Sequence, residues 1–238
     1  MSGGEALGIV LARGGSKGLP DKNGRPCAGR PVLDWTLAHA LGSARLGRVV
    51  LSTDEPRYAA IAAARGVATI LRPVSLAGDT ASVAAAAAHA AAAPGADPDR
   101  RFAAVAVLYG NVPVRPPGLT DAAVEKLLAT GCDSVQSVAG VGKHHPFWMK
   151  EVEGDRLLPH VDNDVHRRQD LPPLFELDGG ALVVTRAGLD AAAAFPGEPH
   201  RFLGADRRAV VNEPGAVVDV DAEVDLRVAE AVLGGGAA

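Results

Sequence analysis

Residues 7–23 read LGIVLARGGSKGLPDKN, and this stretch decides the fold. It joins a short apolar run, Leu7 to Leu11, to a turn rich in glycine and basic residues. A run of this length that ends at glycine is typical of a fully buried strand whose end faces a loop. The sequence therefore predicts a first, central strand with a ligand-binding loop at its carboxyl end.

The loop that follows has the composition of a polyphosphate cradle. Glycine removes side-chain bulk, so backbone N–H groups can approach phosphate oxygens closely, and basic side chains offset the phosphate charge. The glycine spacing matches neither a Walker A loop nor the dinucleotide fingerprint. The residues expected to contact a nucleotide here are Ala12, Arg13, Gly14, Gly15, Ser16, Lys17, Lys22 and Asn23.

Beyond this loop, strand-like and helical patterns alternate over the 238 residues, a length that suits one domain. Strands are expected at residues 49–54, 67–71, 103–108, 133–138, 181–185 and 217–220, and helices at residues 31–41, 58–65, 80–93, 119–130 and 223–233. Such alternation indicates an α/β fold with a mainly parallel sheet, in which ligands bind beyond the carboxyl ends of the strands. Residues 140–178 break the pattern, and we expect them to form an excursion of loops and short strands.

Two carboxylates stand close to the carboxyl terminus, in Val218-Asp219-Val220-Asp221. In a strand, side chains two residues apart point the same way, so both aspartates could reach one ion. Mg²⁺ prefers hard oxygen ligands together with phosphate oxygens and water. Asp219 and Asp221 are therefore the predicted ligands of Mg²⁺, or of Mn²⁺, on a bound triphosphate, whereas Asp225 is interpreted as a helix residue.

Composition and charge exclude several classes of partner. The 24 basic and 28 acidic residues are spread along the chain and give a net charge of −4, unlike the basic footprint of a nucleic-acid binder. The alanine-rich run at 84–93 is shorter than the ~20 apolar residues that cross a membrane, and the first residues do not resemble a secretory signal. Two cysteines give neither a disulfide framework nor a zinc cluster, so we expect a cytoplasmic protein.

The basic loop also resembles a known family. Its pattern Ala-Arg-x-Gly-Ser-Lys-Gly-x-x-x-Lys-Asn is similar to the signature of the acylneuraminate (sialic acid type) cytidylyltransferases, a branch of the three-layer, Rossmann-like nucleotide-diphospho-sugar transferase fold. Matches continue at Ser52-Thr53-Asp54, at Arg72-Pro73, in residues 76–82 and at the twin aspartates. The resemblance implies CTP as the nucleotide, with its base recognised by Arg72, Ala81 and Ser82.

The reaction implied by this family is an in-line displacement. The anomeric hydroxyl of an acidic 2-keto sugar of the neuraminic, legionaminic or pseudaminic type attacks the α-phosphorus of CTP, and pyrophosphate leaves. Arg13 and Lys22 are the expected catalytic cations, because catalysis here depends on positioning and on stabilising phosphate charge. Hydroxide, metal-bound water and Asp221 remain alternatives for the general base.

On the acceptor side, Arg168-Gln169-x-Leu171-Pro172 resembles the family element in which a fork-shaped arginine suits a carboxylate. Arg167 competes with Arg168 for this role. Where the family has Gln-Pro-Thr-Ser-Pro-Leu-Arg, this chain has Tyr109, Gly110 and Asn111 in place of the glutamine and hydroxyls, whereas Pro113 and Arg115 persist. We therefore expect Tyr109, Asn111 and Arg115 to grip a different acceptor, or the same one differently. Phe202 stands where the family has an aromatic side chain against the sugar, with core packing as the alternative.

The resemblance also implies a homodimer, with residues 140–178 as a dimerisation and acceptor-side subdomain of the single domain 1–238. Two other functions stay open at this point. One is a nucleotidyltransferase of the same fold with another acceptor, such as Kdo or a phosphonate, or with another nucleotide. The other is a catalytically degenerate homologue that binds a nucleotide without turnover.

Overall fold

The structure is a computed structural model that describes residues 5–15, 18–78, 81–192, 194–195 and 197–235. Its elements in chain order are β1 (Ala6–Leu11), β2 (Pro26–Cys27), β3 (Arg30–Pro31), α1 (Val32–Leu41), β4 (Leu46–Thr53), α2 (Pro56–Ala64), β5 (Ala68–Leu71), α3 (Val83–Ala92), β6 (Ala104–Tyr109), α4 (Leu119–Thr130), β7 (Ser134–Gly140), β8 (Lys150–Glu153), β9 (Arg156–Pro159), β10 (Phe175–Thr185), α5 (Arg186–Ala192), β11 (Arg207–Asn212) and α6 (Glu223–Gly234). Short 3₁₀ turns join several of them.

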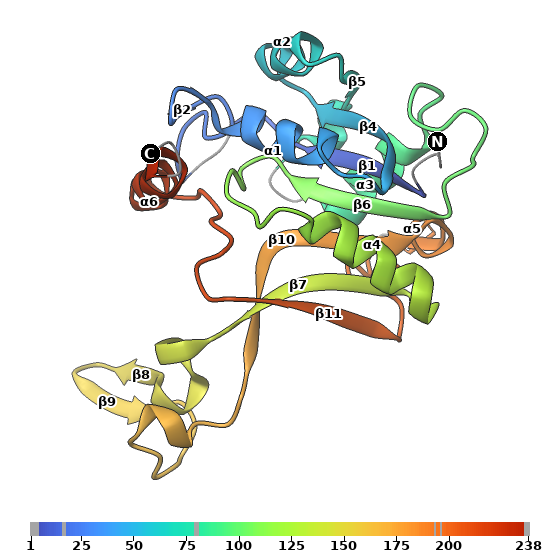
Figure 1. Cartoon of the computed structure of the whole chain (residues 1–238). Coiled ribbons are helices and arrows are strands. Elements are labelled where there is room, and N and C mark those ends of the chain that lie inside the picture. Colours follow the sequence, from blue (N-terminus) through green and yellow to red (C-terminus); the bar gives the residue numbers. More distant parts are fainter. Residues whose placement is uncertain (1–4, 16–17, 79–80, 193, 196, 236–238) are drawn as a thin grey trace.

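Seven strands form one sheet in the order β11-β7-β10-β6-β1-β4-β5 (Figure 1). Strand β10 runs antiparallel to both of its neighbours, β6 and β7, and the other four pairings are parallel. The expected α/β fold with a mainly parallel sheet is confirmed. The first strand lies in the interior of the sheet, so the loop after it opens at the carboxyl ends of neighbouring strands, where α/β proteins bind ligands.

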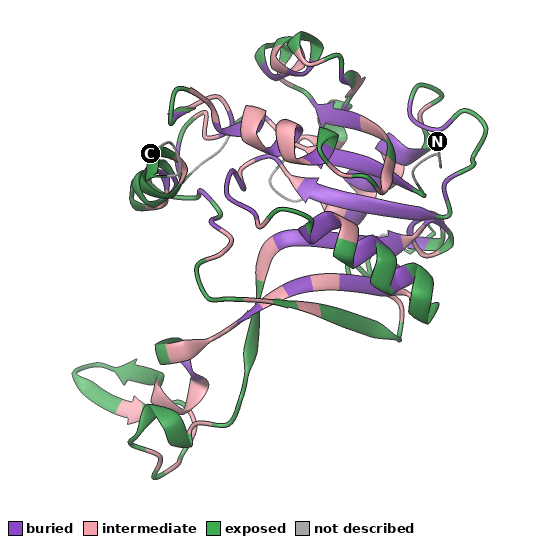
Figure 2. Cartoon of the chain, viewed as in Figure 1, coloured by how far each residue is buried: buried purple, intermediate pink, exposed green. Residues whose placement is uncertain are grey.

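Helices cover both faces of the sheet, and alternate side chains of β1 reach both layers. Leu7 and Ile9 pack with α3 and α5, whereas Ala6 faces the α4 side and Val10 packs with α1 and α2. This division follows from the two-residue period of a strand. Figure 2 shows the burial concentrated on the central strands. The core therefore fixes the strand end from which the basic loop departs.

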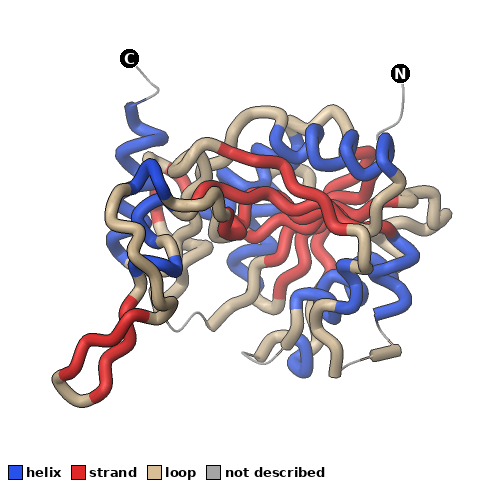
Figure 3. Tube along the Cα trace, turned by 90° about the horizontal axis from the view of Figure 1, so that it is seen from below, coloured by secondary structure: helices blue, strands red, loops and turns tan. Residues whose placement is uncertain are grey.

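The excursion between β7 and β10 extends away from the sheet (Figures 1 and 3). It consists of short 3₁₀ turns and the antiparallel hairpin β8–β9, whose residues are almost all exposed. Within the described ranges, every helix is too short or too polar to span a bilayer.

Three element predictions were wrong or incomplete. Residues 217–220 do not form a strand of the sheet, because this extended segment makes only an isolated antiparallel bridge between Val218 and Val114. The edge strand β11 and the helix α5 were not predicted. Helix α3 begins at Val83 rather than at residue 80, because the Ser82 hydroxyl accepts a hydrogen bond from Ala85 N at 3.1 Å and caps the helix.

Candidate active site

The basic loop leaves β1 between β4 and β6. Ala12 N donates to Ser52 O at 3.1 Å, and Gly110 N donates to Leu11 O at 2.9 Å, so the base of the loop is tied to both neighbouring strands. Gly14 N donates to the Asp54 carboxylate at 2.9 Å. Ser16 and Lys17 lie outside the described residues. The rest of the loop is thus held at the strand ends, as a nucleotide cradle requires.

A cavity of about 190 Å³ opens beside this loop. The residues that line it are Leu11, Arg13, Lys22, Asn23, Arg72, Ala81, Ser82, Val83, Ala86, Tyr109 and Asn111. Most of them were predicted from the sequence to contact a nucleotide or its acceptor. The structure therefore brings residues from five separate stretches of the chain to one place.

Arg72 follows directly after β5 and lines this cavity, and its side chain is hydrogen-bonded to strand β4. Its Nε donates to Ser52 Oγ at 3.2 Å and its Nη2 donates to Ser52 O at 3.0 Å. Burial lowers the pKa of the guanidinium, which nonetheless stays charged because arginine titrates far above neutrality. A fixed donor beside the apolar side chains of Val83 and Ala86 suits the flat, acceptor-bearing edge of a pyrimidine.

The twin aspartates contact Lys22 and Asn111, two residues that line the cavity. Val218 and Val220 are buried, whereas Asp219 and Asp221 are exposed on the same side of the extended segment. Lys22 Nζ donates to Asp221 Oδ1 at 2.5 Å. The predicted convergence of a loop cation and the carboxyl-terminal acids is therefore present in one chain.

Asn111 lies between the two acids. Its Nδ2 donates to Asp219 Oδ1 and, at 3.4 Å, to Asp221 Oδ1. Asp225 turns away into α6, where its Oδ2 accepts from Asp221 N at 3.1 Å and from Ala222 N at 2.8 Å. Asp225 is thus a helix-capping residue, as the sequence indicated.

The electrostatics of this acidic pair favour a cation. Although Asp219 is exposed at the surface, the surrounding protein partly removes water from its carboxyl; this desolvation, followed by the charge of Asp221, raises the pKa of Asp219 to about 6, while the charges of Lys22 and Arg115 oppose the rise. Across the described ranges, no group of three or more His, Cys, Asp or Glu side chains is placed to hold a metal ion. Two hard carboxylates supply only part of a coordination shell, and such partial sets suit Mg²⁺ that completes its shell with phosphate oxygens and water.

Comparison with known proteins bears directly on this site. The sequence profile of the cytidylyltransferase family matches residues 7–173. The chain belongs to this family. The match confirms the resemblance based on the basic loop, and it covers that loop and residues 140–173 of the excursion.

Individual relatives of this cytidylyltransferase extend the match. The CMP-N,N'-diacetyllegionaminic acid synthase of Legionella pneumophila is 29% identical over 233 residues, which are 95% of each chain. The N-acylneuraminate cytidylyltransferase A of Danio rerio is 32% identical over 93% of this chain, which spans 49% of that longer protein. A solved CMP:2-keto-3-deoxy-manno-octonic acid synthetase complexed with CTP superposes with a TM-score of 0.74 at 17% identity, over 98% of this chain and 100% of the other, and shows the shared fold.

Two residues predicted to touch the acceptor lie elsewhere in this cytidylyltransferase. Arg115 is buried, and its guanidinium donates to Gly180 O at 2.6 Å, to Tyr109 O at 3.0 Å and to Thr36 Oγ1 at 3.0 Å. Burial lowers its pKa to about 9. Arg115 therefore braces the end of β6 against β10 from inside the core, and its predicted contact with the acceptor was wrong.

Phe202 is the second correction. It is 4% exposed and packs in the hydrophobic core beneath α3 and α5. The core alternative was correct, because the ring points into the layer of helices behind the sheet rather than toward the cavity.

Arg168 and Gln169 lie in the excursion, in a 3₁₀ turn at Arg168–Asp170. Arg168 lines a separate cavity of about 220 Å³, together with His145 and Phe175. Among the described residues, this cavity shares none with the cavity beside the basic loop, so the contact of Arg168 and Gln169 with an acceptor stays a prediction.

Two residues shape the site although neither was named as a site residue from the sequence. Asp54 holds the Gly14 amide, although only its position at the end of β4 hinted at a role. Gly110 packs so closely against the loop that a Cβ at this position would lie 2.9 Å from Ala12 Cβ and 3.0 Å from Asn23 Oδ1. The departure from the family at residues 109–111 therefore includes a steric requirement for glycine.

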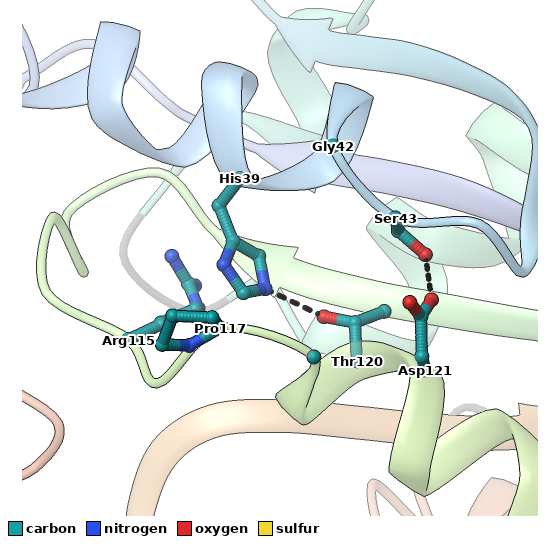
Figure 4. Close-up of a pocket in the computed structure, with 8 residues that line it drawn as sticks. His39, Gly42, Ser43, Arg115, Pro117, Thr120 and Asp121 are labelled. Carbon is teal, nitrogen blue, oxygen red and sulfur yellow. Dashed lines mark hydrogen bonds between the residues drawn. The ribbon is translucent and has the colours of Figure 1, made fainter.

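A third cavity, of about 260 Å³, lies between α1 and the start of α4 (Figure 4). His39 Nε2 is 2.9 Å from Thr120 Oγ1, and the Ser43 hydroxyl donates to Asp121. Burial, followed by the charge of Arg115, lowers the pKa of His39 to about 4, so the imidazole is neutral at pH 7. This cavity shares no residue with the one beside the basic loop.

Proposed function

We propose that this cytidylyltransferase transfers CMP from CTP to an acidic 2-keto sugar of the sialic acid type and releases pyrophosphate. The observation that carries the proposal is the 2.5 Å contact between Lys22 and Asp221, 199 residues apart, at the rim of the cavity that Arg72 and Ser82 line. A cation from the first loop, a carboxylate from the last segment and a base-sized cavity are the parts that a nucleotidyl transfer needs. The whole-length match to a CMP-legionaminic acid synthase supports a nine-carbon sugar acid as the acceptor.

In this proposal, different residues of the cavity bind the base and the triphosphate of CTP. Arg72 and Ser82 lie at the end of the cavity that suits the cytosine ring, with Ala81 beside them. Lys22 contacts Asp221, and Arg13 lines the same cavity within electrostatic range of Arg72; both cations would offset the charge of the triphosphate. A positioned charged group of this kind contributes about 3 kcal/mol to transition-state stabilisation, so catalysis needs no covalent step on the protein.

Asp219 and Asp221 would hold a divalent cation, Mg²⁺ or Mn²⁺, in this proposal. The raised pKa of Asp219 and the spacing of the pair support it, because two close carboxylates are stabilised by a cation between them and the nucleotide. The ion, when bound, supplies positive charge to the triphosphate. Lys22, which contacts Asp221, would add a second positive charge close to the triphosphate.

We further propose a homodimer in which the excursion of one protomer approaches the cavity of the other. Apolar side chains are exposed on and beside the excursion, namely Met149, Val152, Leu157, Phe175 and Leu177. Burying them against a second copy would bring Arg168 and Gln169 to an acceptor carboxylate that they do not reach within one chain. A cytoplasmic location fits the two buried cysteines, Cys27 and Cys132, which are both free.

The test is a substrate screen scored by product. Purified protein is incubated with each of the four nucleoside triphosphates and a panel of acids: neuraminic, legionaminic and pseudaminic acids, Kdo and a phosphonate. We expect pyrophosphate release and a CMP conjugate of the correct mass only with CTP and a nine-carbon acid. Asp221→Asn should abolish release, whereas Asp99→Asn, in the exposed turn before β6, should not.

Other outcomes separate the alternatives. A product with Kdo or with the phosphonate alone would replace the acceptor and keep the reaction. Binding of CTP without pyrophosphate release with any acid would identify a degenerate homologue and overturn the proposal.

A further inference from the structure

The contacts of Asn111 differ from those expected of an acceptor-binding residue. Its Nδ2 donates to Asp219 Oδ1, to Asp221 Oδ1 at 3.4 Å and to Val220 O at 3.2 Å. In the opposite direction, Val220 N donates to Asn111 O at 2.8 Å. One residue at the end of β6 therefore holds three consecutive residues of the acidic segment.

All three neighbours of the amide nitrogen are oxygen acceptors, so the amide presents its NH₂ group to them. Two ionised carboxylates repel each other, and a donor between them lowers that repulsion while fixing the separation of the two inner oxygens. In the described part of the chain, Lys22 donates to Asp221, at 2.5 Å, and not to Asp219. The side-chain amide of Asn111, a neutral donor, is therefore the group that orients the carboxylate of Asp219.

We propose that Asn111 is a positioning residue for the twin aspartates, which it holds at the separation and orientation in which they bind the divalent cation. This inference rests on the proposed function, because it assumes the cation at Asp219 and Asp221. It replaces the expectation that Asn111 contacts the acceptor sugar.

The backbone around Asn111 is held independently of its side chain. Gly110 N donates to Leu11 O, and the Thr36 hydroxyl donates to Gly110 O at 3.2 Å. The acidic segment has its own backbone bonds, Val220 N to Asn111 O and Val218 N to Val114 O at 3.2 Å. Removing the side-chain amide should therefore leave the fold intact and release only the carboxylates.

The magnitude follows from the behaviour of groups that orient metal ligands. Loss of a hydrogen bond to a ligating side chain typically weakens metal binding by about 10- to 100-fold. Asn111→Leu keeps the approximate volume and removes the donor. We expect its Mn²⁺ affinity, measured without any turnover, to fall within that range.

The experiment measures free Mn²⁺ by electron paramagnetic resonance in titrations of the full-length protein, alone and with CTP. Asn212→Leu is the matched control, because Asn212 Nδ2 also donates to a carboxylate, that of Asp178, at 2.7 Å, outside the metal pair. The control should bind Mn²⁺ like the unaltered protein. Urea unfolding of each variant checks that the fold is retained.

The outcomes distinguish this inference from the proposed function. If the unaltered protein binds Mn²⁺ and Asp221→Asn does not, but Asn111→Leu binds it normally, the positioning role is overturned and the metal site stands. A normal Mn²⁺ affinity with a raised KM for the acceptor alone would return Asn111 to the acceptor side. If neither the unaltered protein nor Asp221→Asn binds Mn²⁺, the metal site of the proposed function fails as well.

Discussion

Replacing Gly110 by alanine tests how the nucleotide loop is held. The added Cβ would lie 2.9 Å from Ala12 Cβ, 3.0 Å from Asn23 Oδ1 and 3.1 Å from Leu33 Cδ1. Carbon atoms normally pack at about 3.5–4.0 Å, so all three neighbours would have to move. The methyl group of Leu33 can rotate, but Ala12 is buried and its amide is bonded to Ser52 O.

Overpacking of this kind costs about 1–3 kcal/mol in the free energy of unfolding. For a chain of this size each kcal/mol lowers the Tm by about 2–4 °C. Since the displaced atoms belong to the base of the loop, we expect CTP affinity to fall together with stability.

Urea unfolding followed by tryptophan fluorescence gives the stability, and titration calorimetry gives the Kd for CTP. Gly140→Ala is the control, because a Cβ there meets no atom within 4 Å. Equal stability and equal CTP affinity in the two variants would refute the packing argument.

Three further predictions follow from the site and its surroundings. Lys22→Ala should lower kcat for pyrophosphate release by ~10²-fold or more, and unchanged kinetics would remove Lys22 from the site. The pKa of His39 is about 4 in the fold and 6.5 in the unfolded chain, so its contribution to stability is complete above pH 6.5 and is lost as the pH falls toward 4. Urea titrations at pH 7 and 4.5 should show that His39→Gln reduces this pH-dependent drop in the free energy of unfolding, by up to about 2 kcal/mol after allowance for partial exposure. Arg115→Met should cost about 2–3 kcal/mol of stability by leaving buried carbonyls without a donor, and an unchanged urea midpoint would show that other donors replace it.

The features that could be predicted from the sequence are those determined by a few neighbouring residues. The run Leu7–Leu11 and the basic loop identified the central strand and the cavity beside it. The alternation of Val218 and Val220 with two aspartates placed both acids on one side, although the segment is not a strand, because the burial of alternate residues needs only an extended backbone and not a sheet partner.

The features that could not be predicted depend on distant partners. Arg115 lies in a matching motif, but its destination is set by the carbonyl of Gly180, 65 residues away. Strand β11 begins with Arg207 and Arg208 and has no fully buried residue, although Val210 packs against the core; its pairing with β7 therefore leaves no alternating apolar pattern in the sequence. From the sequence, Gly110 could be recognised only as a difference from the family pattern. The close contact with Ala12, which requires glycine at this position, depends on the fold.

The meeting of the two ends of the chain at the cavity has a consequence for biosynthesis. All seven strands of the main sheet are complete at Asn212, before the ribosome adds Asp219 and Asp221. The basic loop makes its final contacts only when the last segment has been added. Gly18 lies so close to this segment that a Cβ there would be 2.9 Å from the carbonyl oxygen of Asp221, and Lys22 pairs with the same residue. During synthesis, all strands of the main sheet are therefore present before the two aspartates of the site. A premature stop codon after β11 would yield a sheet that lacks both acids.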